Sequence, residues 1–201
     1  MIELFARLNP KSINQVGSTS TPLIEITDLC GVLAKLGEQH SWYIYAMIEQ
    51  RRSYNMDLLH KYCQQVILQE MLLRKFKSKL VKPSEFAYGI TKAVIYSHFH
   101  SKGKCPKCNG LGRIGTKKCE KCEGSGNKEY SHEEKVSYGF PMRKDLSRQW
   151  YRQSCNHYDQ FVECLLIELR NDLFFELDII KKQALQYKRD EENADLFDDG
   201  D

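Results

Sequence analysis

Apolar residues recur every three or four positions along much of the chain, which is the spacing of one buried face of an α-helix. The first such stretch begins at Thr27 or Asp28, either of which can cap a helix, and ends before Gly37, a typical C-terminal stop. A second, short apolar stretch covers residues 42–48. Residues 1–22 are rich in Asn, Ser, Thr, Gly and Pro and show no period, which predicts a flexible N-terminal arm.

A longer amphipathic helix is expected over residues 55–80, where apolar side chains hold the helical period. Pro83 should end this helix, because proline cannot continue one. Ser84 is then a suitable cap for another helix over residues 84–99. The end of the longer helix is strongly basic, which complements the helix dipole. Its basic residues are Arg74, Lys75, Lys77, Lys79 and Lys82.

The C-terminal third of the chain has the clearest helical pattern. Ser131 with Glu134 is a capping box for a short helix that must break near Pro141. The last helix starts as early as Ser147 and keeps the helical period through Ile180 without Gly or Pro. Residues 188–201 are strongly acidic, which predicts a disordered tail that cannot bury a core.

These patterns together predict an all-α fold. We expect a helical bundle with an inserted small four-cysteine zinc-finger module, a helix-turn-helix-like element and a long C-terminal helix. The expected regions after the arm are helical residues 23–100, a metal-binding module at 101–130, and residues 131–187 with the helix-turn-helix-like element and last helix. The apolar stripes could also form a coiled-coil dimer, but their spacing is not a strict heptad, which favours packing within the chain.

Composition and charge narrow the class of protein. The 201 residues are 41% hydrophobic and 28% charged, which is typical of globular proteins and excludes collagen-like or wholly disordered chains. The net charge of +3 conceals a segregation of sign, because residues 101–152 hold 13 basic and 6 acidic groups whereas residues 153–201 hold 5 and 13. A basic centre indicates a phosphate-binding surface, with a merely solvated lysine-rich face as the alternative. Neither a membrane span nor a signal peptide is recognisable, so a cytoplasmic protein is expected.

Four of the eight cysteines belong to one pattern, CxxCxGxG, which occurs twice. Two such pairs supply four soft thiolates, the donor set of closed structural zinc sites, with no position left for a catalytic water. The glycines fit this use, because a turn that points backbone N–H groups at sulfur requires φ > 0. Redox or incidental cysteines are the alternative. The pattern predicts one structural Zn²⁺ with the ligands Cys105, Cys108, Cys119 and Cys122.

Basic and polar residues gather where the last helix begins. Asp145 or Ser147 can cap that helix, so that long side chains lie on its first exposed turns, as in a helix-turn-helix reader of DNA. Arginine and glutamine are suited to reading base edges through paired hydrogen bonds. The alternative is an exposed basic face beside a core Trp150. The expected nucleic-acid-binding residues are Arg143, Lys144, Arg148, Gln149 and Arg152.

Two resemblances follow from these motifs. The doubled CxxCxGxG pattern resembles the cysteine-rich module of the DnaJ co-chaperones, but those proteins carry four repeats and a His-Pro-Asp motif that this chain lacks, so co-chaperone activity is not expected. The cysteine pairs together with Trp150-Tyr151-Arg152, Tyr158-Asp159 and Val162 resemble the late-gene antitermination protein Q of lambdoid bacteriophages. This second resemblance covers residues 50–180. Compared with the family pattern, this chain has a shorter linker between the cysteine pairs and a shorter helix after them.

The resemblance to protein Q implies a phage or prophage transcription antitermination factor. Such a factor binds double-stranded DNA near a late promoter and engages the bacterial RNA polymerase holoenzyme, including its sigma subunit, in the host cytoplasm. The alternative is a zinc-stabilised RNA-binding or protein-interaction module. We do not expect an enzyme, because the chain has no phosphate-cradling loop, no zinc-protease motif and no nucleophile paired with a base. Neither a small-molecule substrate nor a membrane partner is expected.

Overall fold

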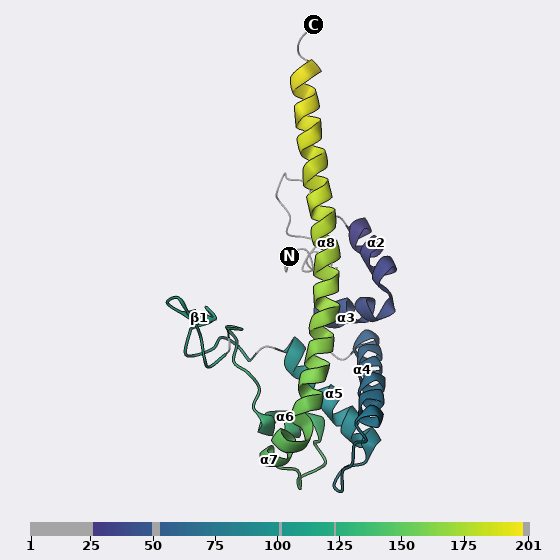
Figure 1. The fold of residues 1–201 in the computed structure, drawn as a ribbon, viewed down its shortest axis with the longest axis vertical. Helices are drawn as coiled ribbons and strands as arrows, with labels where there is room; N and C mark the ends of the chain where they lie inside the picture. Colours follow the sequence, from purple (N-terminus) through teal and green to yellow (C-terminus); the bar gives the residue numbers. More distant parts are fainter. Residues whose placement is uncertain (1–25, 50–52, 101, 123, 199–201) are drawn as a thin grey trace. The chain divides into compact units, whose positions relative to one another are not determined.

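The structure, a computed structural model, describes residues 26–49, 53–100, 102–122 and 124–198 (Figure 1). Helices dominate these ranges, and the only strands within them lie in the cysteine segment, as the apolar pattern predicted. Each described helix is too short or too polar to cross a bilayer. The chain forms two compact units, the second of which is Gln50–Leu166. The N-terminal arm predicted for residues 1–22 lies outside the described residues.

The first unit contains α2 (Ile26–Leu36), α3 (Glu38–Glu49) and the part of α8 (Asn156–Asp198) that follows Leu166. The predicted stop at Gly37 is confirmed, because this residue follows α2 with φ +101°. The predicted caps are wrong: α2 begins at Ile26, which places Thr27 and Asp28 inside its first turn. The core of this unit is formed by Leu29, Val32, Ile44, Leu173 and Leu177.

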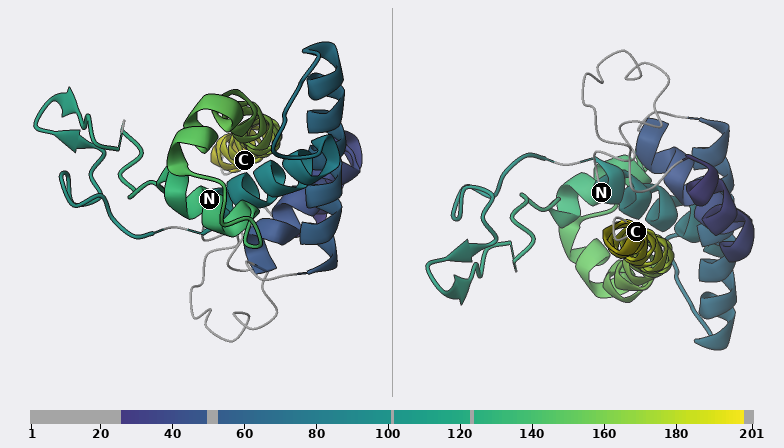
Figure 2. Two further views of the ribbon diagram at one scale, coloured as in Figure 1. Left: turned by 90° about the horizontal axis from the view of Figure 1, so that it is seen from below. Right: turned by 90° about the horizontal axis from the view of Figure 1, so that it is seen from above.

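The second unit is built around α5 (Pro83–Phe99), which packs against α4 (Tyr54–Leu73) and α6 (His132–Gly139) (Figure 2). The approach of α5 and α6 is close, because a methyl group on Gly139 would lie 2.3 Å from the carbonyl oxygen of Gly89. Gly89 also serves packing, because a methyl group on it would lie 2.2 Å from the ring of Phe140. The largest fully buried side chains here include Leu59, Ile67, Phe86, Ile90, Val94, Tyr151 and Leu166.

The end of α4 differs from the prediction, because the helix stops at Leu73 and not near Leu80. Lys75 adopts φ 51°, and the N–H groups of Lys75 and Phe76 donate to the carbonyl oxygens of Leu72 and Met71 at 3.1 and 2.8 Å. These two hydrogen bonds form a Schellman motif, which closes a helix. The basic residues that follow, Lys77, Lys79 and Lys82, are thus exposed outside α4 rather than in its last turn.

The start of α5 also corrects the sequence analysis. Pro83 is the first residue of this helix, a position where its missing N–H costs nothing, and Lys82 is the N-cap. Ser84 lies inside the helix and does not cap it. The helix buries Phe86 and Ile90, neither of which is accessible to solvent.

Helix α6 begins at the predicted capping box. The Ser131 hydroxyl accepts from the N–H of Glu134 at 3.3 Å, and the Glu134 carboxylate accepts from the N–H of Ser131 at 2.8 Å. The helix ends at Gly139, just before the break expected near Pro141. The structure therefore confirms both ends of this short helix.

The last helical segment starts at the predicted residue but changes its winding. Ser147 caps α7 (Arg148–Trp150) by accepting from the N–H of Trp150 at 3.1 Å, and a π-helical stretch, η2 (Tyr151–Cys155), leads into α8. The helix then continues to Asp198, so most of the tail that we predicted to be disordered over residues 188–201 is helical. No Gly or Pro interrupts it before Gly200, and Ala, Leu and Glu favour the helix.

Candidate metal centre and basic helix start

The four cysteines of the repeated pattern come together. The Sγ atoms of Cys105, Cys108, Cys119 and Cys122 all lie within 4.8 Å of one another, and each side chain is at most 4% exposed. The sulfurs of Cys108 and Cys122 are 3.6 Å apart, far beyond a disulfide bond of about 2.05 Å. A tetrahedral ion with metal–sulfur bonds of about 2.3 Å places its sulfurs about 3.8 Å apart, so this group could hold a metal ion.

Backbone amides from two glycine turns point at the sulfurs. The N–H of Gly112 donates to Cys108 Sγ and that of Gly126 donates to Cys122 Sγ, each at 3.3 Å. Both glycines have positive φ, as the pattern predicted. Burial alone would raise the pKa of Cys122, but hydrogen bonds from Gly126 and from neighbouring thiols outweigh it and lower the pKa to about 7. Such a thiol yields its proton to a metal readily.

The two CxxCxGxG turns are related by a local twofold symmetry. The N–H of Cys105 donates to the carbonyl oxygen of Gly126 at 2.7 Å, and the equivalent N–H of Cys119 donates to that of Gly112 at 2.9 Å. Two equivalent antiparallel pairings accompany them, Lys104 with Asn127 and β1 (Arg113–Ile114) with β2 (Lys117–Lys118). Each half thus completes the other half's backbone hydrogen bonds.

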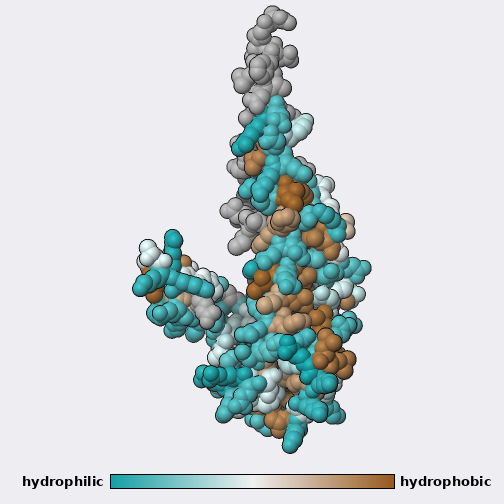
Figure 3. All heavy atoms as spheres, viewed as in Figure 1, coloured by the Kyte–Doolittle hydropathy of each residue, from teal (hydrophilic) through white to brown (hydrophobic). Residues whose placement is uncertain are grey.

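The cysteine segment carries a strongly basic surface, which is mainly hydrophilic (Figure 3). One lysine, Lys107, is paired with Glu120 at 3.1 Å. Lys102 instead pairs with Glu134 of α6, and this contact, with Ser131, lowers the pKa of Glu134 to about 2. The exposed basic residues of the segment include Lys104, Arg113, Lys117, Lys118, Lys121 and Lys128.

Of the predicted nucleic-acid-binding residues, Arg143 is the one that the structure removes from an open surface. Its guanidinium donates to Asp145 at 2.7 and 2.8 Å, to Glu85 at 3.1 Å and to the carbonyl oxygen of Leu80 at 2.7 Å. The hydrogen bond from Arg143 lowers the pKa of Asp145 to about 2. Because these contacts use all three nitrogens of the guanidinium, we correct its assignment: Arg143 fixes the loop before α7.

The remaining predicted residues share an exposed surface at the start of the last helical segment. Lys144 precedes the cap, Arg148 and Gln149 lie in α7, and Arg152 lies in η2. The side chains of these four residues make no hydrogen bond or ion pair with another described residue. Trp150 turns the other way and meets the ring of Phe140 edge-on, with centroids 5.3 Å apart. The helix start therefore presents an open polar face and a packed aromatic face.

A buried polar network, which was not predicted from the sequence, holds this helix start in place. The hydroxyl of Tyr151 donates to Asp159 at 2.6 Å, and the ammonium of Lys135, from α6, donates to both Asp159 oxygens at 2.8 Å. Burial and the Asp159 carboxylate raise the pKa of Tyr151, so its hydroxyl stays protonated as a donor. In the sequence, Tyr151 and Asp159 stood out only as members of the motif that resembles protein Q. Nothing in the sequence marked Lys135 as their partner.

The structure thus gathers the four predicted metal ligands and leaves Arg148, Gln149 and Arg152 together on one exposed surface, while Arg143 belongs to the scaffold. Burial lowers the pKa of His132, and the charges of Arg148 and Arg152 act in the same direction, which places this ring near the basic face. Comparison with known proteins adds no relative: no protein-family model matches the chain, and no curated protein matches its sequence.

Proposed function

We propose that the protein is a zinc-stabilised regulator of transcription that binds double-stranded DNA. The first support is the donor set. Four thiolates without an oxygen ligand favour Zn²⁺ over hard ions such as Mg²⁺ or Ca²⁺. Cys105, Cys108, Cys119 and Cys122 would hold one ion, whose role is structural because four protein ligands complete its shell.

The observation that carries the DNA-binding part is the exposed group Arg148, Gln149 and Arg152, whose side chains have no hydrogen-bond or ion-pair partner within the described part of the chain. Arg148 and Arg152 are four residues apart, a spacing that brings side chains onto one helix face. Their guanidinium groups and the Gln149 amide can donate to phosphates and to base edges in the major groove. Lys144 adds a phosphate contact just before the cap. The buried network around Asp159 keeps this face in a fixed orientation.

We extend the proposal to antitermination. The resemblance of the cysteine pairs and the Trp150 to Val162 stretch to the late-gene antitermination protein Q supports a phage or prophage factor that binds near a late promoter. Such a factor would engage the bacterial RNA polymerase holoenzyme with its sigma subunit and allow terminators to be read through in the host cytoplasm. A zinc-stabilised RNA-binding or protein-interaction module is the competing function.

The DNA-binding step is tested with the zinc-loaded full chain in mobility-shift assays on duplexes from late-promoter regions. Arg148→Ala and Arg152→Ala should each weaken specific binding about tenfold, the range expected for loss of a base contact. Arg189→Ala, which removes an exposed arginine from the far part of α8, serves as the matched control and should leave affinity unchanged. Equal affinity of all four proteins would place the reading surface elsewhere.

The antitermination step is tested by transcription with purified bacterial RNA polymerase on a template that carries a late promoter and a downstream terminator. The wild-type protein should increase read-through, and Cys119→Ser should abolish the increase. Duplex binding without read-through would overturn antitermination while leaving a DNA-binding regulator. Tighter binding to RNA than to any duplex would favour the competing module.

A further inference from the structure

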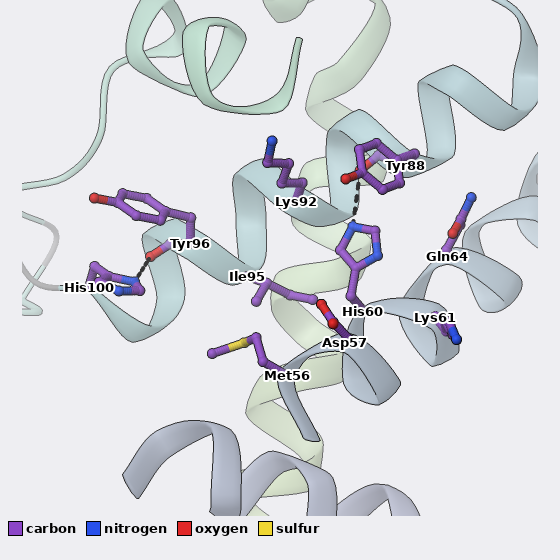
Figure 4. Close-up of a pocket in the computed structure, with 10 residues that line it drawn as sticks. All are labelled: Met56, Asp57, His60, Lys61, Gln64, Tyr88, Lys92, Ile95, Tyr96 and His100. Atoms are coloured by element: carbon purple, nitrogen blue, oxygen red, sulfur yellow. Dashed lines mark hydrogen bonds between the residues drawn. The ribbon is translucent and has the colours of Figure 1, made fainter. Parts of the chain in front are cut away.

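A cavity of about 600 Å³ lies between α4 and α5 of the second unit (Figure 4). Helix α5 and its C-cap present a stripe in which aromatic and cationic side chains alternate at four-residue intervals, which places them on one face. That stripe consists of Tyr88, Lys92, Tyr96 and His100. Across from it, α4 contributes the polar residues Asp57, Lys61 and Gln64, and Met56 and Ile95 supply an apolar patch.

Fixed contacts hold one end of this cavity in shape. The His60 Nε2 atom lies 3.0 Å from the Thr91 hydroxyl and 3.3 Å from the Tyr88 carbonyl oxygen. The imidazole also meets the Tyr88 ring edge-on, with centroids 4.8 Å apart. Burial lowers the pKa of His60, which favours the neutral ring at neutral pH. His60 therefore acts as an uncharged wall that positions Tyr88.

The opposite end is a stack of rings. Tyr96 lies between two partners, His100 at a centroid distance of 4.3 Å and Tyr138 at 3.7 Å, and both pairs are stacked. These partners occupy the faces of Tyr96. Tyr88 is different, because the residue is 48% exposed and no described ring stacks on it. His60 meets it in a T-shaped contact, and the Lys92 ammonium lies over its ring, 5.9 Å from the centroid. Tyr88 is thus the ring that remains open to a ligand.

The charges of the cavity favour an anion. Lys61 is exposed and Lys92 is half-buried, and neither forms an ion pair with another described residue. The one acidic residue of the lining is Asp57. The two lysines outweigh this carboxylate by one positive charge. Figure 4 shows Lys92 between Tyr88 and Tyr96, and its ammonium lies over the Tyr88 ring, where it is close to any base or phosphate bound there.

We propose that this cavity binds a single nucleotide, with its base against Tyr88 and its phosphate at Lys92 and Lys61. A simple inorganic anion would need the lysines but not the ring, and an apolar ligand would need the ring but not the lysines. An amide such as Gln64 can donate to and accept from a base edge. The cavity volume is in the range of small-ligand sites. The nucleotide comes either free in solution or as an unpaired residue of a nucleic-acid strand, since both present a base and a phosphate.

The test uses the zinc-loaded full chain and three probes: AMP and inorganic phosphate by titration calorimetry, and a fluorescein-labelled five-residue oligothymidylate by anisotropy. Tyr88→Leu should weaken binding of the nucleotide probe at least fivefold, since base stacking on an aromatic ring contributes about 1–3 kcal/mol. Lys92→Gln should weaken it as well. The matched controls are Tyr54→Leu and Lys79→Gln, which change an exposed tyrosine and an exposed lysine outside the cavity.

The outcomes separate the two sources and the two proposals. Binding of the oligonucleotide but not AMP assigns the cavity to a strand, and equal affinity for both assigns it to a free nucleotide. The inference is overturned if neither AMP nor the oligonucleotide binds, or if inorganic phosphate binds as tightly as AMP. It is also overturned if Tyr88→Leu and Tyr54→Leu bind the nucleotide probe with the same affinity. Arg148→Ala should leave nucleotide binding unchanged. The duplex-binding proposal can therefore fail while the nucleotide proposal stands, and the nucleotide proposal can fail while duplex binding stands.

Discussion

One carboxylate, that of Asp159, connects three parts of the second unit. It accepts hydrogen bonds from Lys135 of α6 and from Tyr151 of η2 while it is itself part of α8. The side chains of Lys135 and Asp159 are only 17% and 11% exposed. Removing one member of a largely buried ion pair leaves the other charge without compensation, and this costs more than the pair contributes.

We therefore expect Asp159→Asn to lower the free energy of unfolding by about 3 kcal/mol, since Asn keeps the shape but leaves the Lys135 ammonium without its counter-charge. The measurement is urea denaturation of the zinc-loaded protein. The control is Asp178→Asn, which breaks an exposed i,i+4 pair with Lys182 and should change stability by less than about 0.5 kcal/mol. Equal losses in the two variants would contradict a structural role for the network.

At this residue scale the sequence predicted the grouping of the four cysteines but not the use of each arginine. The cysteines are recognisable in the sequence, because their spacing has few other uses. Arg143 and Arg148 look alike in sequence, both basic and both near a helix start. Only the fold brings Glu85 and the Leu80 carbonyl beside Arg143, and those partners lie about sixty positions away in the chain.

The end of α4 is the element whose boundary depends most on tertiary packing. The Schellman motif there requires a residue with positive φ, and the chain provides Lys75 where glycine would be preferred. The chain then turns so that Phe76 packs against Phe86 and Tyr158, with ring centroids 4.4 and 5.6 Å away. Burial of this aromatic side chain offsets the strain of the lysine backbone.

Replacing Lys75 with glycine should accordingly stabilise the protein by about 1 kcal/mol, because it removes the steric cost of a side chain in the left-handed region. Lys77→Gly is the matched control: it removes the same side chain from an exposed position that has no positive φ, and it should be neutral or destabilising. Thermal melting of both variants checks the prediction. A lower melting temperature for Lys75→Gly would show that the motif does not form.

Elements with local signals were predicted well. The capping box before α6 and the cap at Ser147 involve residues only three positions apart, so the sequence contains all that determines them. The stop at Leu73 was missed because the helical pattern itself continues, and what ends the helix is the distant packing of Phe76. The π-helical stretch was missed too, and its first residue, Tyr151, is the one that donates a hydrogen bond to Asp159.

For the molecule as a whole, the cysteine cluster and the apolar cores of the helices are separate groups of buried side chains. The cluster of buried side chains around the proposed ion consists of the four cysteines alone. The helical units have apolar cores of their own, such as that around Leu173 and Leu177. Structural zinc contributes about 10–16 kcal/mol to the folding of small modules. The described residues of the cysteine segment form no apolar core that could replace this contribution.

Chelation should then unfold the cysteine segment and leave the helices largely intact. We expect one zinc per chain by elemental analysis, and only a small loss of helical circular dichroism when a chelator removes it. Cys119→Ser should not retain the metal, whereas Cys30→Ser, which changes an exposed cysteine outside the cluster, should keep full stoichiometry. A cooperative collapse of the helical signal on chelation would refute the separation of metal centre and helical cores.

The local twofold symmetry of the cysteine segment bears on how such a module can arise. A single CxxCxGxG turn leaves its Cys N–H and Gly carbonyl groups without partners and offers only half a ligand shell, so it gains little by folding alone. A second copy supplies both the missing hydrogen-bond partners and the missing ligands. The N–H of Cys119, for example, donates to the carbonyl oxygen of Gly112. Tandem duplication of one short peptide therefore supplies both halves of the four-cysteine cluster, and only the turn between the paired strands β1 and β2 is left to vary in length without disturbing it.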